Sequence, residues 1–254
     1  MSQRTADQCS KRYLQLMKRC LTRTIFPDSV MNINLVPTGQ FDLQAREEGG
    51  DWPSEAETMI GMQRLDNLED CVVSVIRDGI PGDLVETGVW RGGASIFMKA
   101  ILEAFGARDR HVWLADSFQG LPEPNAKKYP ADEGDTLSQF APYLAVSVEK
   151  VKSNFERYDL LDDRVHFLEG WFRDTLPVAP FEKIAVLRLD GDMYESTIEA
   201  LEYLYPKLSA GGYLIVDDYG ALANCRAAVN DFRQKHHISC PVHKIDWTGV
   251  FWRR

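Results

Sequence analysis

From residue 83 to the end of the sequence, short apolar runs alternate with amphipathic segments, and this alternation constrains the fold more than any other feature. The apolar runs predict strands at residues 83–87, 111–116, 164–168, 184–190, 213–218, 242–246 and 249–252. The amphipathic segments predict helices at residues 93–105, 146–158, 194–207 and 224–236. Such alternation is typical of an α/β fold with a mostly parallel sheet and helices on both faces. The last two strands are close in sequence, so we expect an antiparallel hairpin at one edge.

The N-terminal part of the chain has a different pattern. Residues 1–53 are predicted to form a helical extension, and residues 54–254 the main domain. Apolar residues recur at helical spacing between Tyr13 and Leu21, with basic residues among them. This spacing predicts an amphipathic helix that packs on the main body or on a second subunit.

A helix start is predicted where the main domain begins. Ser54 precedes Glu57 by three residues, which is the spacing of a capping box. An apolar face at helical spacing follows, and Gly79 and Pro81 are expected to end this helix.

Composition and charge exclude several classes of function. The 254-residue chain carries a net charge of −9 and has no basic stripe that could neutralise nucleic-acid phosphates. No apolar run approaches the roughly 20 residues of a membrane span, and the polar N-terminus lacks the apolar segment of a signal peptide. The five cysteines are scattered and form no CxxC pair, which argues against a zinc site or a disulfide framework. We therefore expect a cytoplasmic protein that binds neither nucleic acid nor membrane.

Two acidic motifs each follow an apolar run. They are Asp190-Gly191-Asp192 and Asp217-Asp218. The carboxyl ends of parallel strands meet at one edge of a sheet, so these side chains should converge in a crevice. Three carboxylates suit a hard cation, and Asp190, Asp217 and Asp218 are the predicted ligands of Mg²⁺. The alternative for Asp217 and Asp218 is a solvated turn.

Asp192 is the candidate catalytic base. None of the five histidines falls in a motif, so we look for the base among the carboxylates. Asp192 lies two residues past Asp190 and could face the substrate instead of the metal. A free aspartate has a pKa of about 3.9, but desolvation would raise it and a metal would make the substrate hydroxyl more acidic. The alternative role for Asp192 is a helix N-cap.

A glycine turn follows the first strand of the α/β region, in Glu86-Thr87-Gly88-Val89-Trp90-Arg91-Gly92-Gly93. It is not a GxGxxG fingerprint, because Trp90 stands where the second glycine would let a pyrophosphate approach the backbone. The turn therefore favours a cofactor without a pyrophosphate, and S-adenosylmethionine fits. Asp116, which ends the next strand, is placed to bind two ribose hydroxyls, as in both cofactor classes.

Other residues at the strand ends fit the same cofactor. Glu86 could hold the amino group of its methionine tail or orient the turn, and Gly88 and Gly92 would admit the methionine portion. Trp171, after Gly170, could offer an aromatic face to adenine. The alternatives are a tight turn without a ligand for the glycines and core packing for Trp171.

Five segments of the sequence resemble one known family. They are VETGVWRGGASIF, ADSFQGLP, EGWFRDTLP, VLRLDGDMYEST and GGYLIVDDY, within a match that runs from about residue 54 to the C-terminus. They resemble the macrocin O-methyltransferase (TylF-type) family, whose members methylate sugar hydroxyls during the assembly of macrolide, aminocoumarin and related antibiotics.

The resemblance implies a class I methyltransferase: a Rossmann-like, seven-stranded, mostly parallel sheet, with S-adenosylmethionine, Mg²⁺ and usually a homodimer. It matches Asp190, Asp217 and Asp218 to the metal ligands and Asp192 to the base. The predicted cofactor-binding residues are Thr58, Met59, Glu86, Thr87, Gly88, Asp116, Ser117, Gly170, Trp171 and Asp190.

The predicted reaction is methylation of a deoxysugar hydroxyl. We expect Mg²⁺ to hold two vicinal hydroxyls while Asp192 removes one proton, and residues 119–143, a long loop rich in proline, to form a lid over the acceptor. The acceptor is a small-molecule glycoside or a nucleotide-linked sugar. The alternative functions are a catechol-type methyltransferase acting on a phenol, a metal-dependent nucleotide-sugar transferase, a nicotinamide oxidoreductase and a non-catalytic binding module.

Overall fold

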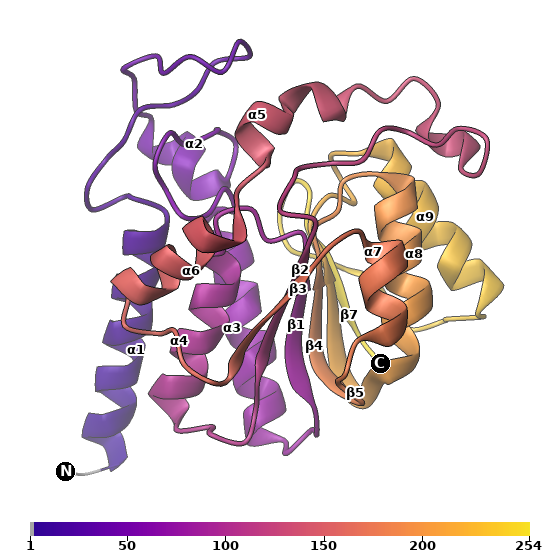
Figure 1. The fold of residues 1–254 in the computed structure, drawn as a ribbon. Helices are drawn as coiled ribbons and strands as arrows, with labels where there is room; N and C mark the ends of the chain where they lie inside the picture. Colours follow the sequence, from indigo (N-terminus) through magenta and orange to yellow (C-terminus); the bar gives the residue numbers. More distant parts are fainter. Residues whose placement is uncertain (1–2) are drawn as a thin grey trace.

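The computed structural model describes residues 3–254, with side chains from residue 8 onward. Seven strands form one sheet in the order β3-β2-β1-β4-β5-β7-β6, which Figure 1 shows nearly edge-on. Its strands are β1 (Asp83–Thr87), β2 (Val112–Asp116), β3 (Val165–Glu169), β4 (Ile184–Leu189), β5 (Leu208–Val216), β6 (His243–Lys244) and β7 (Val250–Arg253). The strands β1 to β5 run parallel, whereas β7 is antiparallel to β5 and β6. The predicted fold class and edge hairpin are therefore confirmed.

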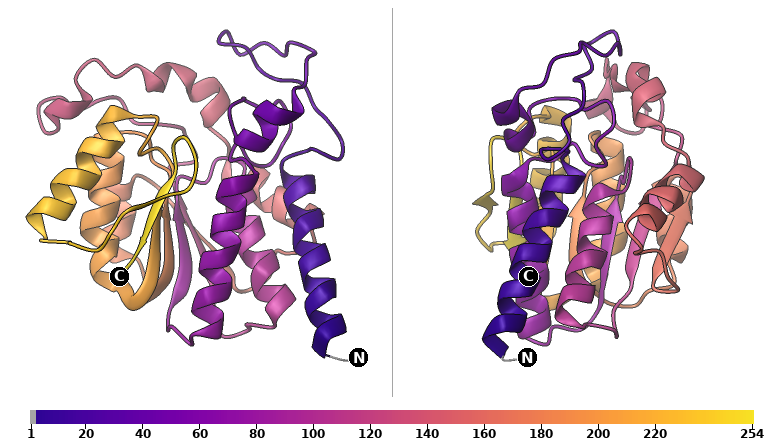
Figure 2. Two further views of the ribbon diagram at one scale, coloured as in Figure 1. Left: turned by 180° about the vertical axis from the view of Figure 1, so that it is seen from behind. Right: turned by 90° about the vertical axis from the view of Figure 1, so that its left-hand side faces the viewer.

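Helices cover both faces of the sheet (Figures 1 and 2). One face carries α1 (Gln3–Leu21), α3 (Met62–Arg77), α4 (Gly93–Phe105) and α6 (Val148–Arg157). The other carries α7 (Phe172–Thr175), α8 (Tyr194–Leu204) and α9 (Ala223–Lys235). The central strands β1, β4 and β5 are apolar on both faces because each face is buried under helices.

Apart from the start of α3, the boundaries of the elements differ from prediction mainly around β5 and β6. β5 begins at Leu208, before its predicted start at residue 213, because Gly211 and Gly212 interrupt the apolar pattern without ending the strand. β6 has only the two residues His243 and Lys244.

The N-terminal helix α1 packs against α4 of the main body. Leu14 and Leu21 are fully buried in the core on that side of the sheet. Lys18 is also buried, and its ammonium forms ion pairs with Asp66 and Glu69 of α3. The amphipathic pattern is thus explained by packing within the chain. The division at residues 53 and 54 stays a prediction.

The predicted capping box is wrong. Residues 54–61 are not helical, and α3 begins at Met62 after Gly61, which has no side chain to cap it. The segment lies instead against the glycine turn, where the Gly93 amide donates to the Glu57 carbonyl at 2.9 Å. The Glu57 carboxylate accepts a hydrogen bond from the hydroxyl of Tyr158 at 3.1 Å. These tertiary contacts outweigh the local capping pattern.

Two segments lie above the carboxyl ends of the strands, at the top of Figure 1. The first belongs to the N-terminal extension and contains the helix α2 (Leu43–Glu48). The second is residues 119–143, the predicted lid, with short helical turns at Pro130–Asp132 (η1) and Leu137–Phe140 (η2) and the start of α5 (Ala141–Leu144). Within residues 3–254, no helix has the length and apolar character needed to span a bilayer.

Candidate active site

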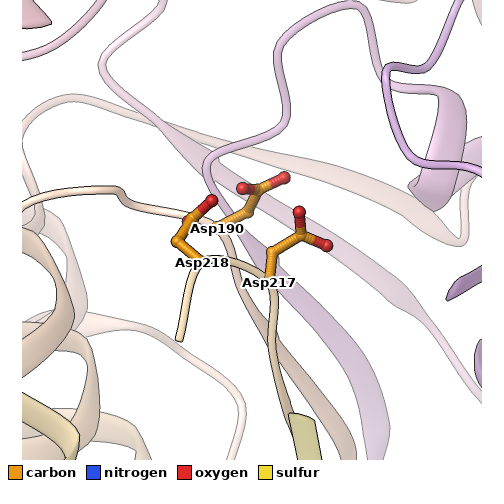
Figure 3. Close-up of side chains that lie close together, drawn as sticks. All are labelled: Asp190, Asp217 and Asp218. Carbon is orange, nitrogen blue, oxygen red and sulfur yellow. The ribbon is translucent and has the colours of Figure 1, made fainter. Parts of the chain in front are cut away.

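The structure brings three aspartates together at the upper edge of the sheet (Figure 3). Asp190 directly follows β4, and Asp217 and Asp218 follow β5. The two strands are hydrogen-bonded neighbours, with Leu189 beside Val216, so the residues after them are also adjacent. Each aspartate offers one carboxylate oxygen, and these three oxygens all lie within 4.8 Å of one another. The predicted convergence is present, and metal binding remains a prediction.

Two buried arginines hold part of this cluster. Arg188 of β4 forms ion pairs with Asp190 at 2.8 Å and with Asp217. It also contacts Glu86 at the end of β1, at 2.6 Å. Arg64 of α3 pairs with the other oxygen of Asp217. Sequence reasoning missed both arginines, although a charged residue inside the apolar run of β4 was a signal for Arg188.

The pKa values show how unevenly this charge is distributed. Burial opposes ionisation of Asp217, but Arg188 and Arg64 outweigh it and hold the pKa of Asp217 below its usual value. Burial raises the pKa of Asp190, and burial together with the neighbouring Asp192 raises the pKa of Asp218 well above its usual value. The cluster therefore has more carboxylate than its arginines neutralise. A hard divalent cation fits this donor set.

Asp192 lies in the turn between β4 and α8. Its φ of 59° is in the left-handed region, which is uncommon for a residue other than glycine. The N-cap of α8 is Met193, so the alternative role of Asp192 as that N-cap is wrong. Burial, followed by the nearby charge of Asp190, raises the pKa of Asp192 to about 8. A carboxylate with such a pKa can accept a proton near neutral pH.

The glycine turn after β1 is tightly packed. Gly88 has a φ of 79°, and a Cβ atom there would lie 1.7 Å from the carbonyl oxygen of Asp190. A Cβ at Gly92 would lie 2.7 Å from a methyl group of Val151 in α6. Close packing by itself therefore requires glycine at both positions, whether or not a ligand also approaches Gly88.

Glu86 is buried below this turn. It accepts hydrogen bonds from Ser95 and from Arg188. Burial raises the pKa of Glu86 to about 7, against the lowering effect of Arg188. Glu86 is thus held between α4 and β4, and its role toward the glycine turn or a cofactor stays a prediction.

Most predicted cofactor residues line two adjoining cavities. The first cavity has Gly88, Asp116, Ser117 and Trp171 in its wall. The second has Thr58, Glu86, Asp217 and Asp218. Residues that border both are Met59, Trp90, Leu144, Asp190 and Asp192. Thr87 and Gly170 line neither cavity: Thr87 is buried, and the Gly170 amide donates to the Asp116 carbonyl at 2.8 Å.

The first cavity combines a fixed carboxylate with aromatic surface. Asp116 in its wall accepts hydrogen bonds from the amides of Val89 and Phe118, both at 2.7 Å, so its carboxylate is fixed. Trp171 and Phe172 supply aromatic surface. The lid contributes Leu121 and Pro122 to this cavity and Leu137 to the second.

Sequence reasoning also missed two tryptophans in the wall of the second cavity. Trp52 comes from the N-terminal segment and Trp247 from the turn between β6 and β7. The ring N–H of Trp247 donates to the carbonyl of Glu48 at 2.9 Å, although half of the residue is exposed. No local pattern in the sequence placed either ring near the aspartates.

The sheet order, the glycine turn and the acidic edge together define a class I, Rossmann-like methyltransferase. The solved structure of the O-methyltransferase NovP is similar, with a TM-score of 0.92 and 50% identity over 96% of this chain and 99% of that one. A family model described as Macrocin-O-methyltransferase (TylF) matches residues 10–254. The chain therefore belongs to the macrocin O-methyltransferase (TylF) family, as the sequence motifs predicted, and it is an enzyme.

Two curated relatives are similar over nearly their whole lengths. The chain is 56% identical over 241 residues, 95% of this chain and 92% of the relative, to the 8-demethyl-8-(2,3-dimethoxy-alpha-L-rhamnosyl)-tetracenomycin-C 4'-O-methyltransferase of Streptomyces olivaceus. It is 51% identical over 244 residues, 95% of this chain and 96% of the relative, to the mycinamicin III 3''-O-methyltransferase of Micromonospora griseorubida.

Proposed function

We propose that the protein transfers a methyl group from S-adenosylmethionine to a sugar hydroxyl of a natural-product glycoside, with Mg²⁺ bound by Asp190, Asp217 and Asp218. The convergence of these carboxylates beside the cavity that contains Asp116 carries the proposal. The tetracenomycin relative is named for a rhamnosyl acceptor, which supports a sugar over a phenol. Antibiotic biosynthesis is the corresponding setting.

The residues have distinct roles in this reaction. S-adenosylmethionine would supply the methyl group, and Mg²⁺ would acidify the hydroxyl that it binds. Asp116 would bind the ribose, and Trp171 would pack on the adenine. Asp192 would take the hydroxyl proton as the sugar oxygen bonds to the methyl carbon, while the electron pair of the broken C–S bond stays on sulfur. The lid would exclude water from this step.

The second cavity favours a sugar already attached to an aglycone over a nucleotide-linked sugar. Among the described residues that line it, Arg64 and Arg188 are its cations, and both are already paired with carboxylates. A diphosphate would therefore meet a negative wall without a free cation. Trp52, Trp247 and Leu137 instead offer apolar surface to an aglycone.

The D192N variant tests the proposed base. It should bind S-adenosylhomocysteine and Mg²⁺ as the parent does but lose turnover, because the amide cannot accept the proton. A matched control is Asp109→Asn, on the exposed turn at the opposite end of the sheet. A kcat for D192N within about tenfold of the parent would show that this residue is not the base. Removal of divalent ions by chelation should abolish activity, and Mg²⁺ should restore it.

We also propose a homodimer. Apolar side chains of the N-terminal segment are exposed in the single chain, including Phe26, Ile33 and Val36. Light scattering coupled to gel filtration should give twice the chain mass for the parent, and a monomer would contradict this proposal.

The five cysteines form no disulfide, which supports a reducing compartment, the cytoplasm.

A further inference from the structure

A buried aspartate of the lid contacts α8. This helix follows residues 190–193, which carry Asp190 and Asp192 and are called the catalytic turn below. Asp132 is 0% exposed, although its neighbours Ala131 and Glu133 are exposed. One of its carboxylate oxygens accepts a hydrogen bond from the amide of Tyr194, and the other from the amide of Glu195, each at 2.8 Å. These two amides are the first of α8.

This contact takes the place of a local helix cap. The first amides of an α-helix have no partner within the helix, and a side-chain oxygen usually satisfies one of them. The N-cap of α8 is Met193, which has no such oxygen. A carboxylate from a segment 62 residues earlier in sequence therefore caps α8 and also meets the positive end of its dipole.

The capped amides lie directly after the catalytic turn. Asp190 and Asp192 occupy the short connection between β4 and α8, and Asp192 has a left-handed backbone. A residue in this conformation keeps it only where its surroundings hold it. The Asp192 amide has one long contact, 3.4 Å to a carboxylate oxygen of Asp218. The orientation of Asp192 thus depends on how firmly the start of α8 is held.

The same lid segment also reaches α9, the helix that follows the second acidic motif, Asp217-Asp218. Asn224, at the start of α9, donates to Asp132 at 3.3 Å and to Asp135 at 3.0 Å. Because α9 follows Asp217 and Asp218, the lid is bonded to the helices that follow both acidic motifs.

We propose that Asp132 is a positioning residue for methyl transfer: it couples the seated lid to the orientation of Asp192 through the first two amides of α8. The inference rests on the proposed role of Asp192 as the base. When the lid is in place, the turn that carries Asp192 is held at both ends. When the lid lifts, α8 loses its cap and the turn loosens.

The D132N variant tests this coupling. An asparagine keeps the size of the side chain but offers one acceptor oxygen, and its NH₂ group faces the second amide. We expect kcat to fall about tenfold or more, while the KM for S-adenosylmethionine and the affinity for S-adenosylhomocysteine change less than about threefold. Hydrogen exchange of the peptide that spans residues 190–195 should become faster.

Tyr129→Phe is the matched control. Tyr129 is also a lid residue, and its hydroxyl contacts α8 at Glu199, at 2.9 Å, away from the first amides. Y129F should leave exchange of residues 190–195 unchanged and kcat within about threefold of the parent. An equal loss of kcat in both variants would reduce the role of Asp132 to general anchoring of the lid and overturn the proposal.

Other outcomes are equally decisive. Unchanged exchange and a kcat within about twofold of the parent in D132N would overturn the coupling. If D132N does not fold, Asn224→Ala removes a donor to Asp132 and should speed the same exchange, and unchanged exchange there would also overturn it. Full activity of D192N would refute the proposed base, whereas the exchange of residues 190–195 reports on Asp132 independently of that role.

Discussion

Replacement of Arg188 by methionine should weaken the folded protein more than any loss of a surface charge. Arg188 is 2% exposed and pairs with Glu86, Asp190 and Asp217. R188M keeps a long apolar side chain in the centre of the sheet but leaves the buried carboxylates of Glu86 and Asp217, and the partly buried one of Asp190, without this cation. Breaking a buried ion pair by removing one partner typically costs about 3–5 kcal/mol.

This loss converts into a measurable change in melting temperature. In a protein of this size 1 kcal/mol shifts Tm by about 2–4 °C, so we expect a decrease of about 6–20 °C in the presence of a chelator. Arg77→Met is the control, because Arg77 is an exposed helix residue paired with Asp78. A surface pair contributes at most about 1 kcal/mol, so the control should melt within a few degrees of the parent.

The decrease in melting temperature of R188M, relative to the parent, should become larger as the pH rises. A buried carboxylate with a raised pKa keeps its proton in the folded state up to a higher pH than it does in the unfolded state. Its contribution to stability therefore falls as pH rises toward the folded pKa. Glu86 already has a pKa of about 7 with Arg188 beside it. The difference in Tm between R188M and the parent should thus be larger at pH 8 than at pH 6.

Mg²⁺ should restore part of the stability of R188M, because it supplies positive charge to Asp190 and Asp217. Differential scanning calorimetry with and without Mg²⁺ measures both effects. If R188M melted within about 2 °C of the parent under chelation, the carboxylates would not depend on this arginine, and our account of the site's electrostatics would be wrong.

Three further predictions concern the metal, the acceptor and the glycine turn. Mg²⁺ binding below the folded pKa of Asp218 should release protons, because this pKa is raised in the metal-free protein. Calorimetry over a pH series in two buffers of different ionisation enthalpy measures the release, and zero release throughout would contradict the prediction. W247A should raise the KM for the glycoside by about 5–30-fold and leave that for S-adenosylmethionine unchanged, since Trp247 lines only the second of the two cavities; equal changes in both would contradict this assignment. G88A should abolish cofactor binding, because its Cβ would meet the Asp190 carbonyl; G79A, where φ is also positive but space is open, should bind normally, and equal behaviour in binding assays would refute the argument.

The parallel sheet and the position of the acidic edge could be predicted from the sequence. The runs that became β1, β4 and β5 are apolar because both of their faces are buried, and the first carboxylates after β4 and β5 must then lie at one edge. Both signals depend on residues adjacent in sequence. The capping pattern at Ser54 and Glu57 is just as local, yet it failed because tertiary contacts hold that segment against Gly93.

The sequence by itself determined which strands end in carboxylates and to which family the chain belongs. Both conclusions depend on apolar runs and contiguous motifs, whose residues are close together in sequence. Only the tertiary structure decided what surrounds those carboxylates. Arg64 meets Asp217 across 153 positions, and Asp132 reaches the amide of Tyr194 across 62. No periodic pattern in the sequence predicts such pairs, because the partners become neighbours only when the helices and the lid pack onto the sheet.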